Sequence, residues 1–123
     1  MSKLIGCILS GSDFKKNFTG PFYKFLNHDL IHYDFKYKLG LNIDHVPFNP
    51  IGECNKGGLY FCEEFYCYYH LTMFWRYLAT IEIPDDAQVY IESFKFKADK
   101  IIVKDITKFR DVDDKFSLSS SFL

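Results

Sequence analysis

The sequence predicts an α+β fold in which two or three helices pack on a small, mainly antiparallel sheet. Segments with strand patterns and segments with helical apolar spacing follow one another in the order β-α-β-loop-β-α-β-β-β. The last three strands come without a helix between them, which favours antiparallel pairing. A length of 123 residues suits one domain, which we expect to span residues 1–123.

The first half of the chain is expected to hold a strand, a helix, a second strand and a loop. The apolar segment Lys3–Leu9 predicts a strand, and Asp13 in the following turn is placed to cap what comes next. Pro21–Ile31 predicts a helix, because proline suits the first helical position and apolar residues follow at helical spacing. Tyr33–Leu39 alternates apolar and charged residues, the pattern of a half-buried strand. Leu41–Lys56 is rich in turn residues and predicts a long loop.

The second half is expected to hold a buried strand, an aromatic helix and three further strands. Gly58–Cys62 is continuously apolar, as in a buried strand. The segment from Glu63 to about Trp75 predicts a helix that is apolar on nearly every face, and such a helix is buried or docks on a partner. Residues 111–123 are expected to form a loose tail. The three further strands are expected at Tyr77–Ile83, Gln88–Ser93 and Lys100–Ile106.

Composition limits the classes of partner. Aromatic residues make up 20% of the chain, with 14 Phe and 9 Tyr, which suggests a phenylalanine-rich core and tyrosines left for a partner surface. The net charge of −1 argues against a broad nucleic-acid footprint. No apolar segment reaches the roughly 18 residues of a membrane span, and the short N-terminal apolar run does not match a signal sequence. We therefore expect a protein of the cytosol or nucleus without a membrane partner.

Four segments of the sequence carry recognisable motifs, namely Lys36–Asn42, Pro50–Phe61, Ile83–Tyr90 and Phe96–Val103. They resemble motifs of an uncharacterised domain of giant DNA viruses, of the mimivirus and marseillevirus type, that often precedes ankyrin repeats. Pro50–Phe61 resembles its G-x-C-x-x-G-G-L-Y-F element, with the G-G-L-Y-F signature at Gly57–Phe61. The other three matches, in the same order as in that domain, are Lys36–Asn42 (Y-x-x-G-L-N), Ile83–Tyr90 (L-P-x-D-A-x-V-Y) and Phe96–Val103 (F-K-A-D-K-I-I-L). No ankyrin repeat follows them in this sequence. The resemblance implies a viral protein in the host cytoplasm or nucleus, or in the virion, and implies no reaction.

A second resemblance concerns the strand Gly58-Leu59-Tyr60-Phe61, which is similar to an element of ADP-ribosyltransferase folds. In those folds a tyrosine stacks on the nicotinamide of NAD, so Tyr60 would be the stacking residue. The resemblance implies His45 as the ribose binder and Glu82 or Glu92 as the late acid. The sequence lacks the His-Gly-Thr or His-Gly-Ser strand of these folds, and His45 lies in the predicted loop. Tyr60 as a core aromatic is therefore the favoured interpretation.

The cysteines and histidines predict no metal or nucleophilic site. A zinc site needs four converging soft ligands, and Cys54 lies across a strand from the others, so reduced thiols are expected. The histidines belong to no catalytic signature, and we predict no catalytic, cofactor-binding or metal-binding residue. The zinc ligands considered are Cys54, Cys62, Cys67 and His70, and the histidines are His28, His32, His45 and His70.

Aromatic residues interleaved with lysines raise single-stranded nucleic acid as a further partner. The two segments are Phe35-Lys36-Tyr37-Lys38 and Phe94-Lys95-Phe96-Lys97. Alternation places the aromatics on one face of a strand and the lysines on the other, which any amphipathic strand does without a ligand. Nucleic acid is therefore not the expected partner.

The function predicted from these observations is a non-enzymatic protein–protein interaction module that binds a host or viral protein or forms a homodimer. The aromatic helix carries more apolar surface than a solvated helix needs. An ADP-ribosyltransferase-like NAD-binding enzyme and a single-stranded nucleic-acid binder remain the alternatives, and no cofactor is predicted. The candidate partner-binding residues are Tyr66, Tyr68, Tyr69 and Trp75.

Overall fold

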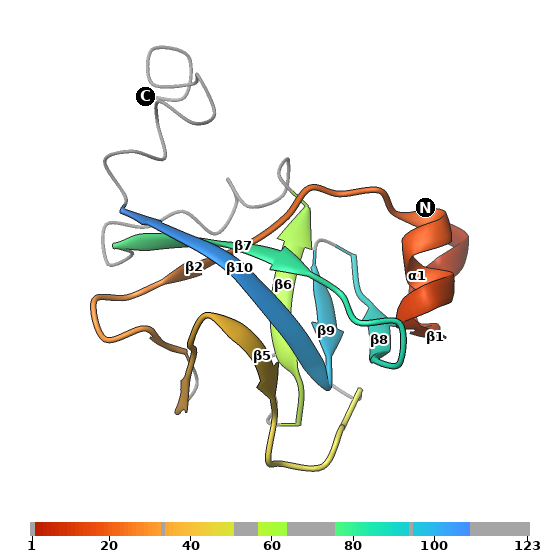
Figure 1. Cartoon of the computed structure of the whole chain (residues 1–123). Helices are drawn as coiled ribbons and strands as arrows, with labels where there is room; N and C mark the ends of the chain where they lie inside the picture. Colours follow the sequence, from red (N-terminus) through yellow and green to blue (C-terminus); the bar gives the residue numbers. More distant parts are fainter. Residues whose placement is uncertain (1, 33, 51–56, 64–75, 94, 109–123) are drawn as a thin grey trace.

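The computed structural model describes residues 2–32, 34–50, 57–63, 76–93 and 95–108, and these residues are mostly β-structure. Eight strands form one antiparallel sheet in the order β1-β8-β9-β6-β2-β7-β10-β5, and β3 and β4 form a separate hairpin (Figure 1). The helical elements of this part are a 3-10 helix (Ser2–Leu4) and α1 (Gly11–Asn17). The strands are β1 (Ile8–Ser10), β2 (Phe22–Leu26), β3 (Ile31–His32), β4 (Phe35–Lys36), β5 (Gly40–Ile43), β6 (Leu59–Glu63), β7 (Tyr77–Glu82), β8 (Gln88–Ile91), β9 (Phe96–Ala98) and β10 (Lys100–Lys108).

The sheet curls back on itself. β9 and β10 are joined by Asp99 alone, yet β6, β2 and β7 lie between them in the sheet. Because one residue spans only a few ångströms, the sheet must bend until the start of β10 lies next to the end of β9. In Figure 1, β10 crosses in front of β6, and its lower end lies at the tip of β9. The bend encloses a core to which both halves of the sheet contribute, and it leaves β1 and β5 as the two edges.

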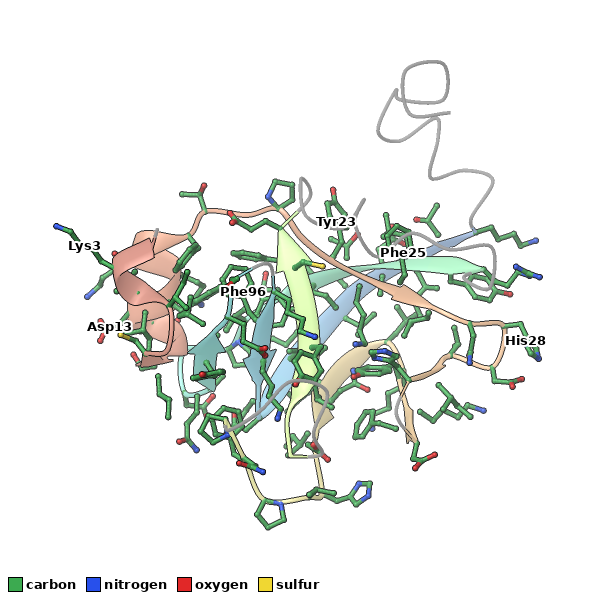
Figure 2. The ribbon with its side chains drawn as sticks, turned by 180° about the vertical axis from the view of Figure 1, so that it is seen from behind. Lys3, Asp13, Tyr23, Phe25, His28 and Phe96 are labelled. Atoms are coloured by element: carbon green, nitrogen blue, oxygen red, sulfur yellow. The ribbon has the colours of Figure 1, made fainter. Side chains whose placement is uncertain are left out.

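Helix α1 closes one end of this core with a phenylalanine. The helix is capped by Ser10, whose Oγ accepts a hydrogen bond from Asp13 N at 3.1 Å. Phe14 is fully buried, and its ring centroid lies 4.9 Å from that of Phe96 and 5.8 Å from that of Phe61, both in edge-to-face geometry. Figure 2 shows Phe96 in the interior and Asp13 on the outer side of the helix. The core is therefore rich in phenylalanine, as the composition predicts.

The predicted α+β class is wrong, because the described residues form an eight-stranded sheet with one α-helix. The segment Pro21–Ile31, predicted as a helix, contains β2, whose five residues are all buried between β6 and β7. A continuous apolar segment matches a buried strand as well as a helix, and aromatic residues favour the strand. The second predicted helix lies outside the described residues, apart from Glu63, which ends β6.

Three further expectations for the first half of the chain are wrong. Tyr33–Leu39 is not one half-buried strand, because β4 is two residues long and pairs with β3 across a turn where Asp34 has a φ of 67°. The expected loop Leu41–Lys56 contains most of β5, which pairs with β10. The predicted strand Lys3–Leu9 begins as a 3-10 helix, and Asp13 lies inside α1 instead of capping it.

The strand predictions for the second half are confirmed. β6, β7, β8 and β10 occupy the four segments in which strands were expected. The tail at residues 111–123 lies outside the described residues, and the domain boundaries 1–123 stay a prediction. Among the described residues there is no helix with the length and apolar character that crossing a membrane requires.

Candidate functional site

Strand β5 forms one edge of the sheet and is held in place by a buried asparagine. Asn42 is 1% exposed, and its Oδ1 accepts a hydrogen bond from Lys38 N at 3.0 Å. Its Nδ2 donates to the carbonyl oxygens of Lys38 at 2.8 Å and Gly40 at 3.0 Å. Gly40 has a φ of 90°, which costs a glycine little. The turn that precedes β5 is therefore locked to the strand.

The outer face of β5 carries exposed apolar side chains. Because side chains alternate between the faces of a strand, the inward position of Asn42 directs Leu41 and Ile43 outward. These two are 46% and 55% exposed, and Leu39 before them is 63% exposed. The half-buried Ile102 of β10 lies opposite Leu41 and continues the apolar surface across the sheet. We call Leu39, Leu41 and Ile43 the β5 apolar edge.

The main chain of β5 also faces outward at Leu41 and Ile43. Asp44 N donates to Asp99 O at 3.0 Å, just beyond the end of the β5–β10 ladder. Hydrogen-bonded pairs alternate with non-hydrogen-bonded pairs in an antiparallel ladder. The main-chain groups of Asn42 and Asp44 therefore point toward β10, and those of Leu41 and Ile43 point away from it. β5 is the last strand in the sheet, so no described strand pairs with this side.

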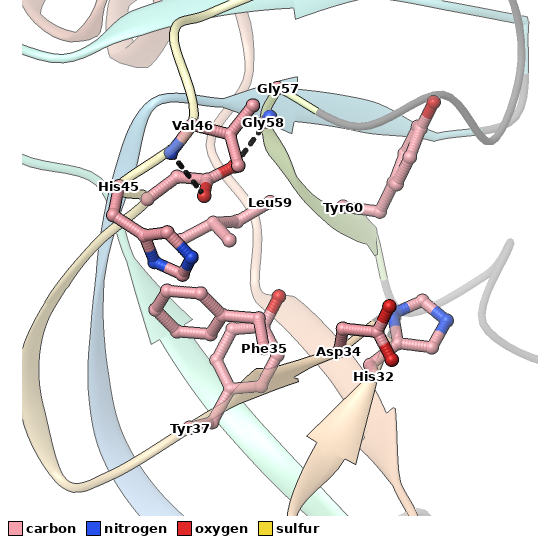
Figure 3. Close-up of a pocket in the computed structure, with 11 residues that line it drawn as sticks. His32, Asp34, Phe35, Tyr37, His45, Val46, Gly57, Gly58, Leu59 and Tyr60 are labelled. Carbon is pink, nitrogen blue, oxygen red and sulfur yellow. Dashed lines mark hydrogen bonds between the residues drawn. The ribbon is translucent and has the colours of Figure 1, made fainter.

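The residues that follow β5 line a pocket of about 490 Å³, counted out to its open mouth (Figure 3). Asp44 anchors this wall, because its Oδ1 accepts from Val46 N at 3.1 Å and its Oδ2 from Gly58 N at 2.8 Å. His45 stacks on Phe35 of the hairpin, with ring centroids 6.1 Å apart. The pocket therefore joins the end of β5, the β3–β4 hairpin and the start of β6.

Two buried polar side chains stabilise the region around this pocket. Tyr37 is 2% exposed, and burial together with the negative charge of Asp44 raises the pKa of its hydroxyl, which therefore stays protonated. Lys24 of β2 is also buried, and its Nζ donates to Tyr60 O at 2.6 Å and lies 2.7 Å from His32 Nδ1. The same ammonium lies 5.0 Å from the centroid of the Tyr37 ring. These contacts tie the hairpin to the sheet.

The glycine pair before β6 is required by its neighbours. Gly57 has a φ of 96°, and a Cβ there would collide with the carbonyl oxygen of Pro47. A Cβ at Gly58 would collide with the side-chain stem of Lys97. Lys97 is fully buried and donates from Nζ to the carbonyl oxygen of Asn49. The stem of Lys97 therefore fills the space that a side chain at position 58 would occupy.

The segments that carry the resemblance to the giant-virus domain meet in these contacts. Lys36–Asn42 contains the three hydrogen bonds by which the Asn42 side chain holds the turn before β5, which we call the asparagine lock. Gly58, from the G-G-L-Y-F segment, donates to Asp44, which directly follows β5. Asp99, from a third segment, accepts a hydrogen bond on Oδ1 from Gln88 N of the fourth at 2.8 Å. These hydrogen bonds therefore link neighbouring strands and loops of the described fold.

The residues implied by the ADP-ribosyltransferase resemblance are only partly brought together. Tyr60 and His45 line the same pocket. The Tyr60 ring is buried, lies 4.4 Å from Lys95 Nζ, and points away from the centre of the pocket in Figure 3. Glu82 is exposed on β7 and Glu92 is buried beyond β8, and neither lines the pocket. The carboxylates of the pocket's described lining are therefore Asp34 and Asp44, and not the glutamates that the resemblance implies.

The remaining candidates form no site in the part of the chain that the structure describes. Within it, no group of three or more His, Cys, Asp or Glu side chains is arranged to hold a metal ion. Cys62 is buried on β6, and the imidazole of His28 is exposed beside Asp29. Outside the described residues lie Cys54, Tyr66, Cys67, Tyr68, Tyr69, His70 and Trp75.

The lysines of the two segments that interleave aromatics with lysines differ in burial. Lys36 and Lys38 are exposed while Tyr37 is buried. Phe96 and Lys97, in contrast, are both buried. Phe96 and Lys97 still face opposite sides of β9, as alternation predicts, and both sides of this strand are buried.

The β5 apolar edge is the feature that sequence reasoning missed. Its signal is present, because Leu39, Leu41 and Ile43 alternate with Gly40 and Asn42 at a period of two. The prolines and glycine that follow made the whole segment look like a loop.

The chain is similar to an ankyrin repeat protein of Acanthamoeba polyphaga mimivirus. The two are 30% identical over 90 residues, which cover 66% of this chain and 29% of that protein. The chain thus spans less than a third of the relative's length. No family model matches the chain. No solved structure matches it either. The link to giant viruses that the motifs imply is supported at this level, and the G-G-L-Y-F signature stays a prediction.

Proposed function

We propose that the chain is a non-enzymatic protein–protein interaction module of a giant virus, acting inside the infected cell, and that β5 is its contact strand. The observation that carries the proposal is the outward presentation of Leu41 and Ile43, which expose both their side chains and their main-chain groups at an edge of the sheet. The similar mimivirus protein, named for its ankyrin repeats, supports the same class of function, since such arrays bind through extended surfaces.

A sheet edge of this kind is a template for another strand. Proteins that must avoid such pairing protect their edges with charged side chains, proline or a covering element. β5 carries no charged side chain and no proline between Gly40 and Ile43, and no described strand covers this edge. An extended segment added to such an edge gains affinity from main-chain hydrogen bonds and specificity from alternate side chains. The β5 apolar edge offers both kinds of contact.

Charged groups in and around the pocket beside β5 favour a structural role for it over a catalytic one. Asp44 uses both carboxylate oxygens to hold the backbone of Val46 and Gly58. Lys24 links β2 to β6 and to the hairpin. Since these charged groups are engaged in holding the chain together, we assign the pocket a structural part in fixing the end of β5.

Site-specific photo-crosslinking tests this proposal. A photoreactive amino acid is placed at position 41 in cells that express the chain, and a matched version carries it at position 8 on the other edge, where Ile8 is 50% exposed. Adducts to protein are expected from position 41 only, and Ile43→Lys in the same chain should suppress them. Equal adducts from both positions, or adducts at position 41 that survive Ile43→Lys, would contradict a contact surface at β5.

A further inference from the structure

We infer that the β5 apolar edge pairs with the β5 strand of a second copy of this chain, antiparallel and about a twofold axis. The inference rests on the proposed function, because it names the occupant of the contact strand. It commits to one register, in which Asn42 faces Asn42 of the second copy. Leu41 then faces Ile43 of the second copy, and the same contact is repeated on the other side of the axis.

The main chain favours this register. Leu41 and Ile43 are the β5 residues whose main-chain groups point away from β10. When Leu41 lies opposite Ile43 of the second copy, outward-facing groups meet outward-facing groups, so each of the two equivalent pairs exchanges two hydrogen bonds. The register uses Gly40 to Asp44 and does not require the turn before β5 to open.

The side chains fit the same arrangement. Residues directly opposite each other in an antiparallel pair share a face of the sheet. Leu41 and Ile43 of the two copies would therefore form one cluster on the outer face. The half-buried Ile102 of each copy, which lies opposite Leu41, extends this cluster on both sides. The cluster covers side chains that are about half exposed in the single chain.

Charge favours the antiparallel direction. Lys38, just before β5, is exposed and forms no ion pair within the described residues, and Asp44 follows the strand. An antiparallel pair brings the basic flank of one copy beside the acidic flank of the other. A parallel pair would place Lys38 beside Lys38 and Asp44 beside Asp44, which is repulsive.

The size of the surface sets the strength of the association. A contact built on a strand of four residues buries less surface area than the roughly 1,200 Å² that stable interfaces bury. The dimer is therefore a weak one, with a dissociation constant in the micromolar range or above. A weak dimer can also give way to a stronger foreign strand at the same edge.

Sedimentation across a series of concentrations, with charged variants, tests the inference. The wild-type chain is expected to shift from monomer to dimer as its concentration rises. Leu41→Glu and Ile43→Lys should each raise the dissociation constant at least about tenfold, while Ile8→Lys on the other edge should leave it unchanged. An equimolar mixture of the Leu41→Glu and Ile43→Lys chains should recover association, because the register places the new glutamate opposite the new lysine.

The outcomes separate this inference from the proposed function. A wild-type chain that stays monomeric into the millimolar range overturns the second copy as the occupant. An equimolar mixture of the Leu41→Glu and Ile43→Lys chains that stays monomeric also overturns the inference, because it shows that positions 41 and 43 do not face each other. If photo-crosslinking at position 41 then gives adducts that are not twice the mass of the chain, the edge binds a foreign protein and only the inference fails. Circular dichroism melts of each variant confirm that its chain is folded.

Discussion

The two edges of the sheet, β1 and β5, expose apolar side chains to a similar degree and yet differ as contact surfaces. Ile8 on β1 is 50% exposed and Leu41 on β5 is 46% exposed. Cys7 and Gly11 bond to β8 and its preceding loop, which leaves the main chain of Ile8 facing outward. The next outward residue, Ser10, already caps α1. β1 therefore offers one outward residue before the chain turns into a helix.

β5 has two outward-facing apolar residues, whereas β1 has one. Leu41 and Ile43 both face outward in main chain and side chain, and the asparagine lock holds the strand extended from its first residue. The comparison teaches that an exposed apolar side chain alone does not make a docking strand. Two outward-facing residues, separated by one inward-facing residue, are needed before main-chain hydrogen bonds and side-chain contacts reinforce one another.

The largest expected effect comes from breaking the lock of β5. Asn42→Ala removes three hydrogen bonds of a buried side chain, which should lower the free energy of unfolding by about 2 kcal/mol. It should also weaken self-association, because the turn no longer holds β5 in place. Urea titration measures the stability. The matched control is Asn17→Ala, which removes one exposed hydrogen bond to Asp13 O and should cost less than about 0.5 kcal/mol.

A smaller loss of stability is expected from changing Ser10, the residue at which β1 ends and α1 is capped. Ser10→Ala removes the N-cap of α1 and should lower the free energy of unfolding by about 1 kcal/mol. Self-association at β5 should be unchanged, because β1 lies at the opposite edge of the sheet. A loss of association in Ser10→Ala equal to that in Asn42→Ala would show that both variants act through global stability, and the distinction between the edges would disappear.

The sequence predicts the second half of the fold better than the first, for a physical reason. β7 alternates at a period of two and β6 is a short apolar run, and both patterns identify strands. Phe22, Phe25 and Leu26 of β2 satisfy the helical spacing equally well, and only the neighbouring strands decide the outcome. Pairing partners far away in the sequence are invisible to a local pattern, which is why a helix was predicted there.

The candidate site was harder to predict than the fold. The aromatic segment containing Tyr66 and Trp75 drew attention through composition, and it lies outside the described residues. The β5 apolar edge rests on a short alternating segment whose meaning depends on its place at the edge of the sheet. Lys97 is buried because Gly58, far from it in the sequence, leaves room for its stem. Edge position and cross-strand space are tertiary properties.

The most direct test of the central claim is amide hydrogen exchange, measured residue by residue at low and high protein concentration. The amides of Leu41 and Ile43 point away from β10, so they should exchange rapidly in the dilute monomer. Self-pairing of β5 predicts that their protection rises with concentration while that of Ile8 stays constant. Protection at Leu41 and Ile43 that is independent of concentration, or that rises equally at Ile8, would contradict the claim.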